Sequence, residues 1–191
     1  MNRNYERISE KFWSLPQKPG EEVNRDRLYM DDQILHDHLE RVIKRHLEEG
    51  MTTVLDAGGG TGRFSIWLAQ QGYRVTHLDI SLPMLEKARE RAKEMGVADR
   101  ITFVHGRLTD LSAYSDGQFD LVLSLDAPVS YTYPHHQRVI GELVRIAARS
   151  VVLCVSNRLG SYPNQFNPGG KMQFLVDERD PDSAVQWYVR E

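Results

Sequence analysis

The chain has little of what marks secreted, disulfide-stabilised or membrane-spanning proteins. Cys154 is its only cysteine, so no disulfide can form within the chain. No apolar run approaches the roughly 20 residues of a membrane helix, and the opening stretch MNRNYERISEKFW has no apolar segment of a secretion signal. We therefore expect a cytoplasmic protein with no membrane span, in which Cys154 is a buried residue of the apolar run SVVLCVS.

An excess of positive charge is also missing. Lys and Arg number 24 against 27 Asp and Glu, and the formal net charge is -3 over 191 residues. A nucleic-acid-binding protein usually shows a basic face, whereas here the two signs are interleaved along the chain. The composition argues against a nucleic-acid partner and leaves the oligomeric state open.

Three parts of the chain differ in pattern. In residues 1–50, Pro16, Pro19 and Gly20 predict a loop through LPQKPGEEVNRDR, and apolar residues at helical spacing then predict a helix over 31–49. Residues 51–157 alternate apolar strands with helices. Residues 158–191 have the pattern of a loop with short strands.

The alternation over 51–157 predicts an α/β fold. Strands are expected at 52–57, 73–79, 101–106, 119–126 and 150–156, and helices at 62–71, 81–95 and 134–147. Parallel strands need crossovers of this kind. We therefore predict a doubly wound, mostly parallel sheet with helices on both faces.

A glycine-rich stretch, DAGGGTG, follows the first of these strands. Glycine permits positive φ and close approach of the backbone to a ligand, and ligands of open parallel sheets bind beyond the carboxyl ends of the strands. The dinucleotide pattern G-x-G-x-x-G/A fails, because its last position, counted from Gly58, falls on Arg63. The spacing D-x-G-x-G-x-G is matched by Asp56, Gly58, Gly60 and Gly62.

With this motif the chain resembles the class I, Rossmann-like S-adenosylmethionine-dependent methyltransferases. The resemblance implies S-adenosyl-L-methionine as the cofactor and S-adenosyl-L-homocysteine as the product. It places Asp56 near the ammonium group, Asp79 on the ribose hydroxyls, and Ile80 and Met84 around the adenine. The cofactor-binding residues that it implies are Asp56, Ala57, Gly58, Gly60, Gly62, Asp79, Ile80, Met84, Arg107, Leu108 and Leu125.

Two further regions of the family bear on this site. In VHGRLTDL the family commonly has an aspartate that meets the adenine amino group, and this chain has Arg107 there. We expect backbone groups of Arg107 and Leu108 to meet the adenine edge instead. In FDLVLSLDAP, the carbonyl of Ser124 or Leu125 is expected to accept a hydrogen bond from the ammonium group.

Candidates for catalysis lie in LDAPVSYTYPHH. Methyl transfer mainly requires alignment of the acceptor, and a general base only where the acceptor is protonated. Asp126 is the candidate to orient or deprotonate an acceptor, with Tyr131 and His136 beside it. DAPV lacks the Asn/Asp-Pro-Pro-Tyr/Phe motif of nucleic-acid amino-methylating members, which favours a small-molecule acceptor. Adjacent histidines diverge on a helix, so no metal site is predicted.

The two ends of the chain are expected to flank this site. In relatives of this type an N-terminal lid often covers the cofactor, which makes candidates of the aromatic residues Tyr5, Trp13 and Tyr29, and of Arg25 or Arg27 for the cofactor carboxylate. A complete domain of the family ends with a helix and an antiparallel hairpin. Residues 158–191 are either that hairpin or, as we favour, a substrate-side insertion in a chain that lacks the usual C-terminal helix and strands.

The predicted function is methyl transfer from S-adenosylmethionine to a small molecule by in-line displacement. A second reading, a non-catalytic cofactor-binding or regulatory protein, gains weight from Arg107 and from the unusual end of the chain. A nicotinamide-dependent oxidoreductase is the third reading.

Overall fold

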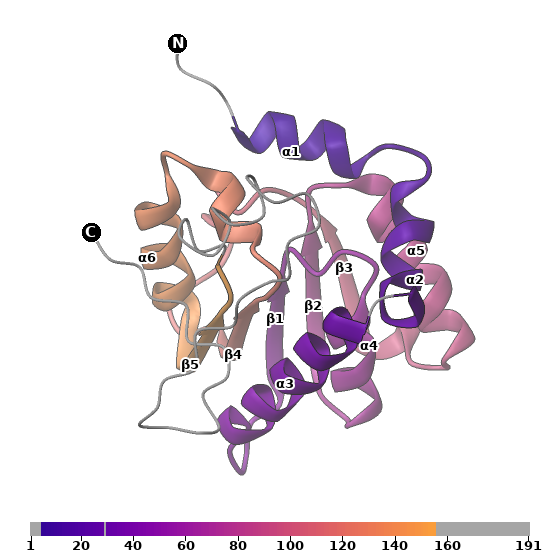
Figure 1. The fold of residues 1–191 in the computed structure, drawn as a ribbon. Helices are drawn as coiled ribbons and strands as arrows, with labels where there is room; N and C mark the ends of the chain where they lie inside the picture. The colour runs from indigo at the N-terminus through magenta and orange to yellow at the C-terminus, as the bar shows by residue number, and fades with distance from the viewer. Residues whose placement is uncertain (1–4, 29, 156–191) are drawn as a thin grey trace, which may run out of the picture.

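A five-stranded parallel sheet forms the centre of the molecule (Figure 1). The computed structural model describes residues 5–28 and 30–155, without the side chains of residues 25–31. The strands are β1 (Thr53–Ala57), β2 (Arg74–Asp79), β3 (Ile101–His105), β4 (Phe119–Ser124) and β5 (Ala147–Leu153). They lie in the order β3-β2-β1-β4-β5, with every neighbouring pair parallel. The predicted α/β class and parallel sheet are confirmed.

Helices cover both faces of the sheet. They are α1 (Tyr5–Trp13), α2 (Lys18–Leu28), α3 (Met30–His46), α4 (Arg63–Gln70), α5 (Leu82–Glu94) and α6 (His136–Ile146), with short 3₁₀ helices η1 (Ala98–Arg100) and η2 (Pro128–Thr132). Because strand side chains alternate between the faces, Val54 and Leu121 pack in one core with α3 and α4. Leu55 and Val122 pack in the other core with α6. In Figure 1, α1 crosses above the carboxyl ends of the strands.

The loop predicted from Pro16, Pro19 and Gly20 is present around Pro16 only and is wrong beyond it, because residues 18–28 form α2. Pro19 is the second residue of that helix, where the missing N–H has no helical partner to lose. Gly20 follows in the same turn, and its carbonyl accepts a hydrogen bond from the Asn24 side chain at 2.9 Å. Proline marked the start of a helix here.

The other boundaries agree with the sequence within a few residues. The helix predicted over 31–49 is α3, and Ser81 caps α5 as expected, accepting a hydrogen bond from the Met84 N–H at 3.3 Å. The helix predicted over 134–147 is α6, which begins at His136 and follows the short helix η2 at residues 128–132. Cys154 is buried one residue beyond β5. Residues 158–191 lie outside the described part, so both interpretations of them stay predictions.

The described helices include none that is long and apolar enough to cross a bilayer. The longest of them, α3, carries charged residues throughout its sequence MDDQILHDHLERVIKRH.

The face of α6 that lies against the sheet should carry most of that helix's contribution to stability. Leu143 is fully buried there and its neighbour Val144 is 56% exposed. We expect Leu143→Ala to lower the free energy of unfolding by about 2–5 kcal/mol and Val144→Ala to change it by less than about 0.5 kcal/mol. Urea titrations of both variants give the comparison, and equal effects would contradict the described packing.

Candidate active site

The carboxylate of Asp79 joins the loop after β1 to the start of α5. Its Oδ2 accepts a hydrogen bond from the Gly60 N–H at 2.8 Å, and its Oδ1 accepts one from the Ser81 N–H at 2.8 Å. The N–H groups of Gly58 and Gly59 both donate to the Leu78 carbonyl, at 2.7 and 3.2 Å. The glycine-rich loop is therefore held against the end of β2 by hydrogen bonds within the protein.

Below this loop lies a buried cluster of Asp56, Ser65 and His77. Asp56 and His77 are neighbours in the β1–β2 register, and Ser65 reaches them from α4. The Ser65 hydroxyl lies 2.6 Å from Asp56 Oδ2 and 2.8 Å from His77 Nδ1. A hydroxyl that donates to the carboxylate must accept from the imidazole, which assigns the proton of neutral His77 to Nδ1. His77 Nε2 is buried with no hydrogen-bond partner among the described residues.

The loop packs directly on this cluster. A Cβ on Gly59 would lie 2.5 Å from the His77 ring and 2.8 Å from Asp56 Oδ2, so no side chain fits at that position. Gly60 has open space around it but a φ of +56°, which disfavours other residues. The two glycines are thus required for different reasons, one for close approach and one for backbone conformation.

Burial sets the protonation of the cluster. It raises the pKa of Asp56 to about 6, with the Ser65 hydrogen bond opposing and the charge of Asp79 adding to the shift. It lowers the pKa of His77 to about 4. Burial also raises the pKa of Asp79, against the hydrogen bonds from Ser81 and Gly60. At neutral pH the site therefore holds an ionised Asp56 beside a neutral histidine.

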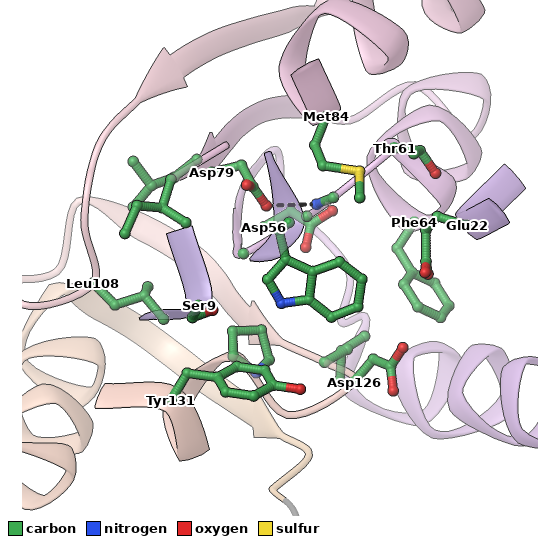
Figure 2. A pocket seen from close by; sticks show the side chains of 18 of the residues that line it. Ser9, Glu22, Asp56, Thr61, Phe64, Asp79, Met84, Leu108, Asp126 and Tyr131 are labelled. Carbon is green, nitrogen blue, oxygen red and sulfur yellow. Dashed lines mark hydrogen bonds between the residues drawn. The ribbon is translucent and has the colours of Figure 1, made fainter. Parts of the chain in front are cut away.

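A single pocket brings most of the predicted site together. Figure 2 shows Asp56, Asp79 and Met84 on one side of it, with Asp126 and Tyr131 on the other. The predicted residues that line it are Asp56, Gly58, Gly60, Asp79, Ile80, Met84, Leu108, Leu125, Asp126 and Tyr131. Trp13, one of the expected aromatic residues of the lid, also lines it.

Four predicted residues do not line the pocket. Gly62 is the N-cap of α4, and the Ala57 carbonyl accepts a hydrogen bond from the Ser124 hydroxyl at 3.0 Å. The Arg107 side chain pairs with carboxylates of α1. His136 stacks on Tyr133, with ring centroids 5.6 Å apart.

The expected lid residues are only partly described. Tyr5 contacts the Tyr133 ring edge-on, with centroids 5.7 Å apart, and does not line the pocket. The side chains of Arg25, Arg27 and Tyr29 lie outside the described residues.

Other lining residues were not predicted. They come from α1, α2, α3, the glycine-rich loop and the first turn of α4, and include Glu6, Ser9, Glu22, His36, Thr61, Arg63 and Phe64. Thr61 lies within the glycine motif, and Arg63 and Phe64 follow it directly, so the motif itself was an available signal. There was no sequence signal for the lining residues of α1 and α2, because no helix was predicted in that segment. Among the described residues, no group of three or more His, Cys, Asp or Glu could hold a metal ion.

The backbone is strained where β4 leads into the pocket. Asp126 and Ala127 have φ angles of +60° and +70°, in the left-handed region that non-glycine residues seldom adopt. Each such residue costs on the order of 1 kcal/mol or more and persists only where its surroundings enforce it. Strain of this kind concentrates at functional sites, and Asp126 lines the pocket.

The parallel sheet, the fastened glycine loop and two buried carboxylates at the reversal of strand order define an α/β protein with a binding site at the switch point. Residues 54–149 match the family described as "Methyltransferase domain". The chain belongs to this family, the class I S-adenosylmethionine-dependent methyltransferases. The predicted family is confirmed, and the nicotinamide-dependent reading is set aside.

Similar proteins within the family differ in what they methylate. The chain is 30% identical over 122 residues to the tRNA 5-carboxymethoxyuridine methyltransferase of Escherichia coli, covering 64% of this chain and 44% of that relative. It is 27% identical over 154 residues to the magnesium-protoporphyrin O-methyltransferase of Rhodobacter capsulatus, covering 80% of this chain and 66% of the relative. The matches therefore span less than two thirds of either relative.

A solved structure supports the fold. The magnesium protoporphyrin IX methyltransferase of Synechocystis, solved with bound S-adenosylmethionine, superposes with a TM-score of 0.62 at 24% identity. The match covers 80% of this chain and 76% of that one.

The opposite pKa shifts of His77 and Asp56 should be visible in the pH dependence of stability. Neutral His77 contributes to the free energy of unfolding above about pH 6.5, and this contribution is lost as the pH falls towards 4. The contribution of Asp56 has the opposite sign: it is present below about pH 3.8 and is lost as the pH rises through 6. In the wild-type protein the two contributions to the free energy of unfolding therefore partly cancel between pH 4 and 6.

We expect His77→Phe to remove one of these two contributions. As the pH is lowered from 7 to 4, the unfolding free energy of the variant minus that of wild type should rise by on the order of 2–3 kcal/mol. Denaturant titrations at half-unit intervals of pH measure this difference. A difference that stays constant over this range would contradict the assignment of a buried neutral histidine.

Proposed function

We propose that the protein transfers a methyl group from S-adenosylmethionine to a small-molecule acceptor. The observation that carries the proposal is the pair of buried carboxylates, Asp56 and Asp79, in one pocket with the glycine-rich loop between them. The cofactor supplies a methyl group on a cationic sulfur, and an in-line displacement leaves S-adenosylhomocysteine. The protein's own task is to hold the two reactants in line.

The residues of the cofactor side suit this ligand. Each carboxylate oxygen of Asp79 accepts one backbone N–H, which leaves further lone pairs for ribose hydroxyls. Ile80, Met84 and Leu108 add an apolar wall for adenine. An ionised, buried Asp56 is stabilised by a ligand ammonium group, whereas a diphosphate beside the same two carboxylates would be repelled.

The acceptor side is the wall of Asp126, Tyr131 and Trp13. Asp126 and Tyr131 lie across the pocket from Met84 (Figure 2). Trp13 comes from α1, and its ring lies 6.4 Å from that of Tyr131, centroid to centroid. Aromatic walls and a carboxylate suit a flat or partly apolar acceptor. His136 stands outside this wall, so the proposal does not include it among the acting residues.

Enclosure of the pocket supports a small acceptor. Residues of α1 line the same pocket, above the strand ends where a bulky acceptor would have to enter. The magnesium-protoporphyrin relative acts on a small molecule by its name, and a tRNA acceptor is the competing outcome.

We expect Asp79→Ala to weaken binding of S-adenosylhomocysteine by about 10–100-fold, because lost hydrogen bonds to a charged group cost roughly 1.5–3 kcal/mol. Isothermal titration calorimetry gives the dissociation constant. Asp110→Ala is the matched control: this carboxylate is exposed and bonds Ser112. An unchanged constant for Asp79→Ala would remove Asp79 from the cofactor site.

We expect Asp126→Asn to lower kcat by about 10²–10⁴-fold if the carboxylate takes a proton from the acceptor, with cofactor binding unchanged. S-Adenosylhomocysteine release, measured with panels of hydroxyl, carboxyl, amine and thiol compounds and with unfractionated tRNA, identifies the acceptor class first. Turnover of tRNA alone would overturn the small-molecule proposal. Cofactor binding without turnover of any acceptor would favour a non-catalytic role.

A further inference from the structure

We propose that Arg107 is a positioning residue: it holds α1 closed over the pocket, and the cofactor exchanges when its pairs with Glu6 and Glu10 open. The pairs are called the latch below. The proposal rests on the proposed function only in taking S-adenosylmethionine or its product as the ligand of this pocket.

The inner face of α1 carries two polar residues and one indole ring. Glu6, Ser9 and Trp13 line the pocket, and Ser9 is the only residue of α1 that is buried. Ile8 and Phe12 point outwards, 54% and 46% exposed. A helix that is packed permanently buries an apolar stripe, but α1 contributes no side chain to either apolar core of the described residues. Apart from the edge-on contacts of Tyr5 with Tyr133 and of Trp13 with Tyr131, polar contacts must hold it in place.

Polar contacts to the ends of β2 and β3 hold α1. Arg107 Nη2 lies 2.5 Å from Glu10 Oε2, and Arg107 Nη1 lies 3.7 Å from Glu6 Oε2. The Thr109 hydroxyl lies 2.8 Å from both carboxylate oxygens of Glu6, to which it donates. The Ser81 hydroxyl donates to the Trp13 carbonyl at 3.0 Å.

These contacts start from the same loops that form the cofactor side. Gly106 and Leu108 line the pocket on either side of Arg107, and Ser81 follows Asp79 and Ile80, which line it too. A ligand that orders these loops therefore also orders the groups that α1 binds. Arg107 stands where the family commonly has an adenine-binding aspartate, and in this chain its side chain is directed to α1 instead.

The latch is built to be reversible. The side chains of Arg107 and Glu10 are 42% and 30% exposed, so water and salt compete for their charges. Partly exposed ion pairs are individually weak. A helix held by a few such contacts opens more readily than the sheet opens, and this allows the cofactor to exchange without unfolding of the core.

The test is the dissociation rate of S-adenosylhomocysteine from the full chain, measured by stopped-flow fluorescence. Trp13→Phe identifies the part of the signal that comes from α1. We expect Arg107→Ala to raise the dissociation rate by on the order of three- to tenfold, with Arg107→Lys intermediate. Arg100→Ala is the matched control, since Arg100 is an exposed arginine that donates to the Gly72 carbonyl; it should leave the rate unchanged.

Charge reversal separates a latch from a general structural role. Glu10→Arg and Arg107→Glu should each speed dissociation, and the double variant should return the rate towards wild type. Added salt should speed dissociation from wild type and leave Arg107→Ala unaffected. If Arg107→Ala fails to fold, the dissociation rates of the Arg107→Lys variant and of wild type at increasing salt still test the latch.

Two results would overturn the proposal: a wild-type dissociation rate in Arg107→Ala, or a double charge reversal that restores nothing. Failure of the proposed function looks different. It appears as absent binding of S-adenosylhomocysteine by wild type, or as binding without turnover of any acceptor.

Discussion

The carboxylate of Asp79 fastens the glycine-rich loop to the start of α5, and the geometry of the pocket follows from that. Each of its two oxygens accepts a hydrogen bond from a backbone N–H, one in the loop after β1 and one in the loop after β2. These two loops are therefore held at a fixed distance from each other. The contact of Gly59 with His77 and Asp56 fixes the height of the loop above the sheet. This side is therefore rigid because it rests on the core, and a ligand meets hydrogen-bonding groups that are already oriented.

The opposite side of the pocket rests on weaker supports. Trp13 and Ser9 belong to a helix held by exposed ion pairs, and Asp126 sits on backbone in an unfavourable conformation. This division fits the proposed function, in which the cofactor binds on the side of Asp79 and the acceptor on the side of Asp126. The family is defined by one cofactor, whereas relatives that are similar to this chain are named for different acceptors, tRNA and magnesium-protoporphyrin. A sequence can therefore identify the cofactor without identifying the acceptor.

The sequence predicted features whose cause is local. The strands and the capping role of Ser81 follow from periodicity and from short-range hydrogen bonds. The glycine motif was recognised from the spacing of its own residues. Ser65 and His77 were missed because they meet Asp56 only once the register of β1 and β2 is set. The partner of Arg107 was missed for a similar reason, since Glu10 lies 97 positions away along the chain. Helix α2 was missed because Pro16 and Pro19 were interpreted as marking a loop.

The burial of Cys154 has a practical consequence. Cys154 is 4% exposed, and its backbone N–H and carbonyl are hydrogen-bonded to Ser124 and Ala127. A buried thiol in apolar surroundings reacts slowly with alkylating reagents. A cysteine introduced at Ile8 on the outer side of α1 is therefore the one that a maleimide dye or nitroxide modifies in the folded protein, and the attached reporter follows that helix in solution without removal of the native thiol.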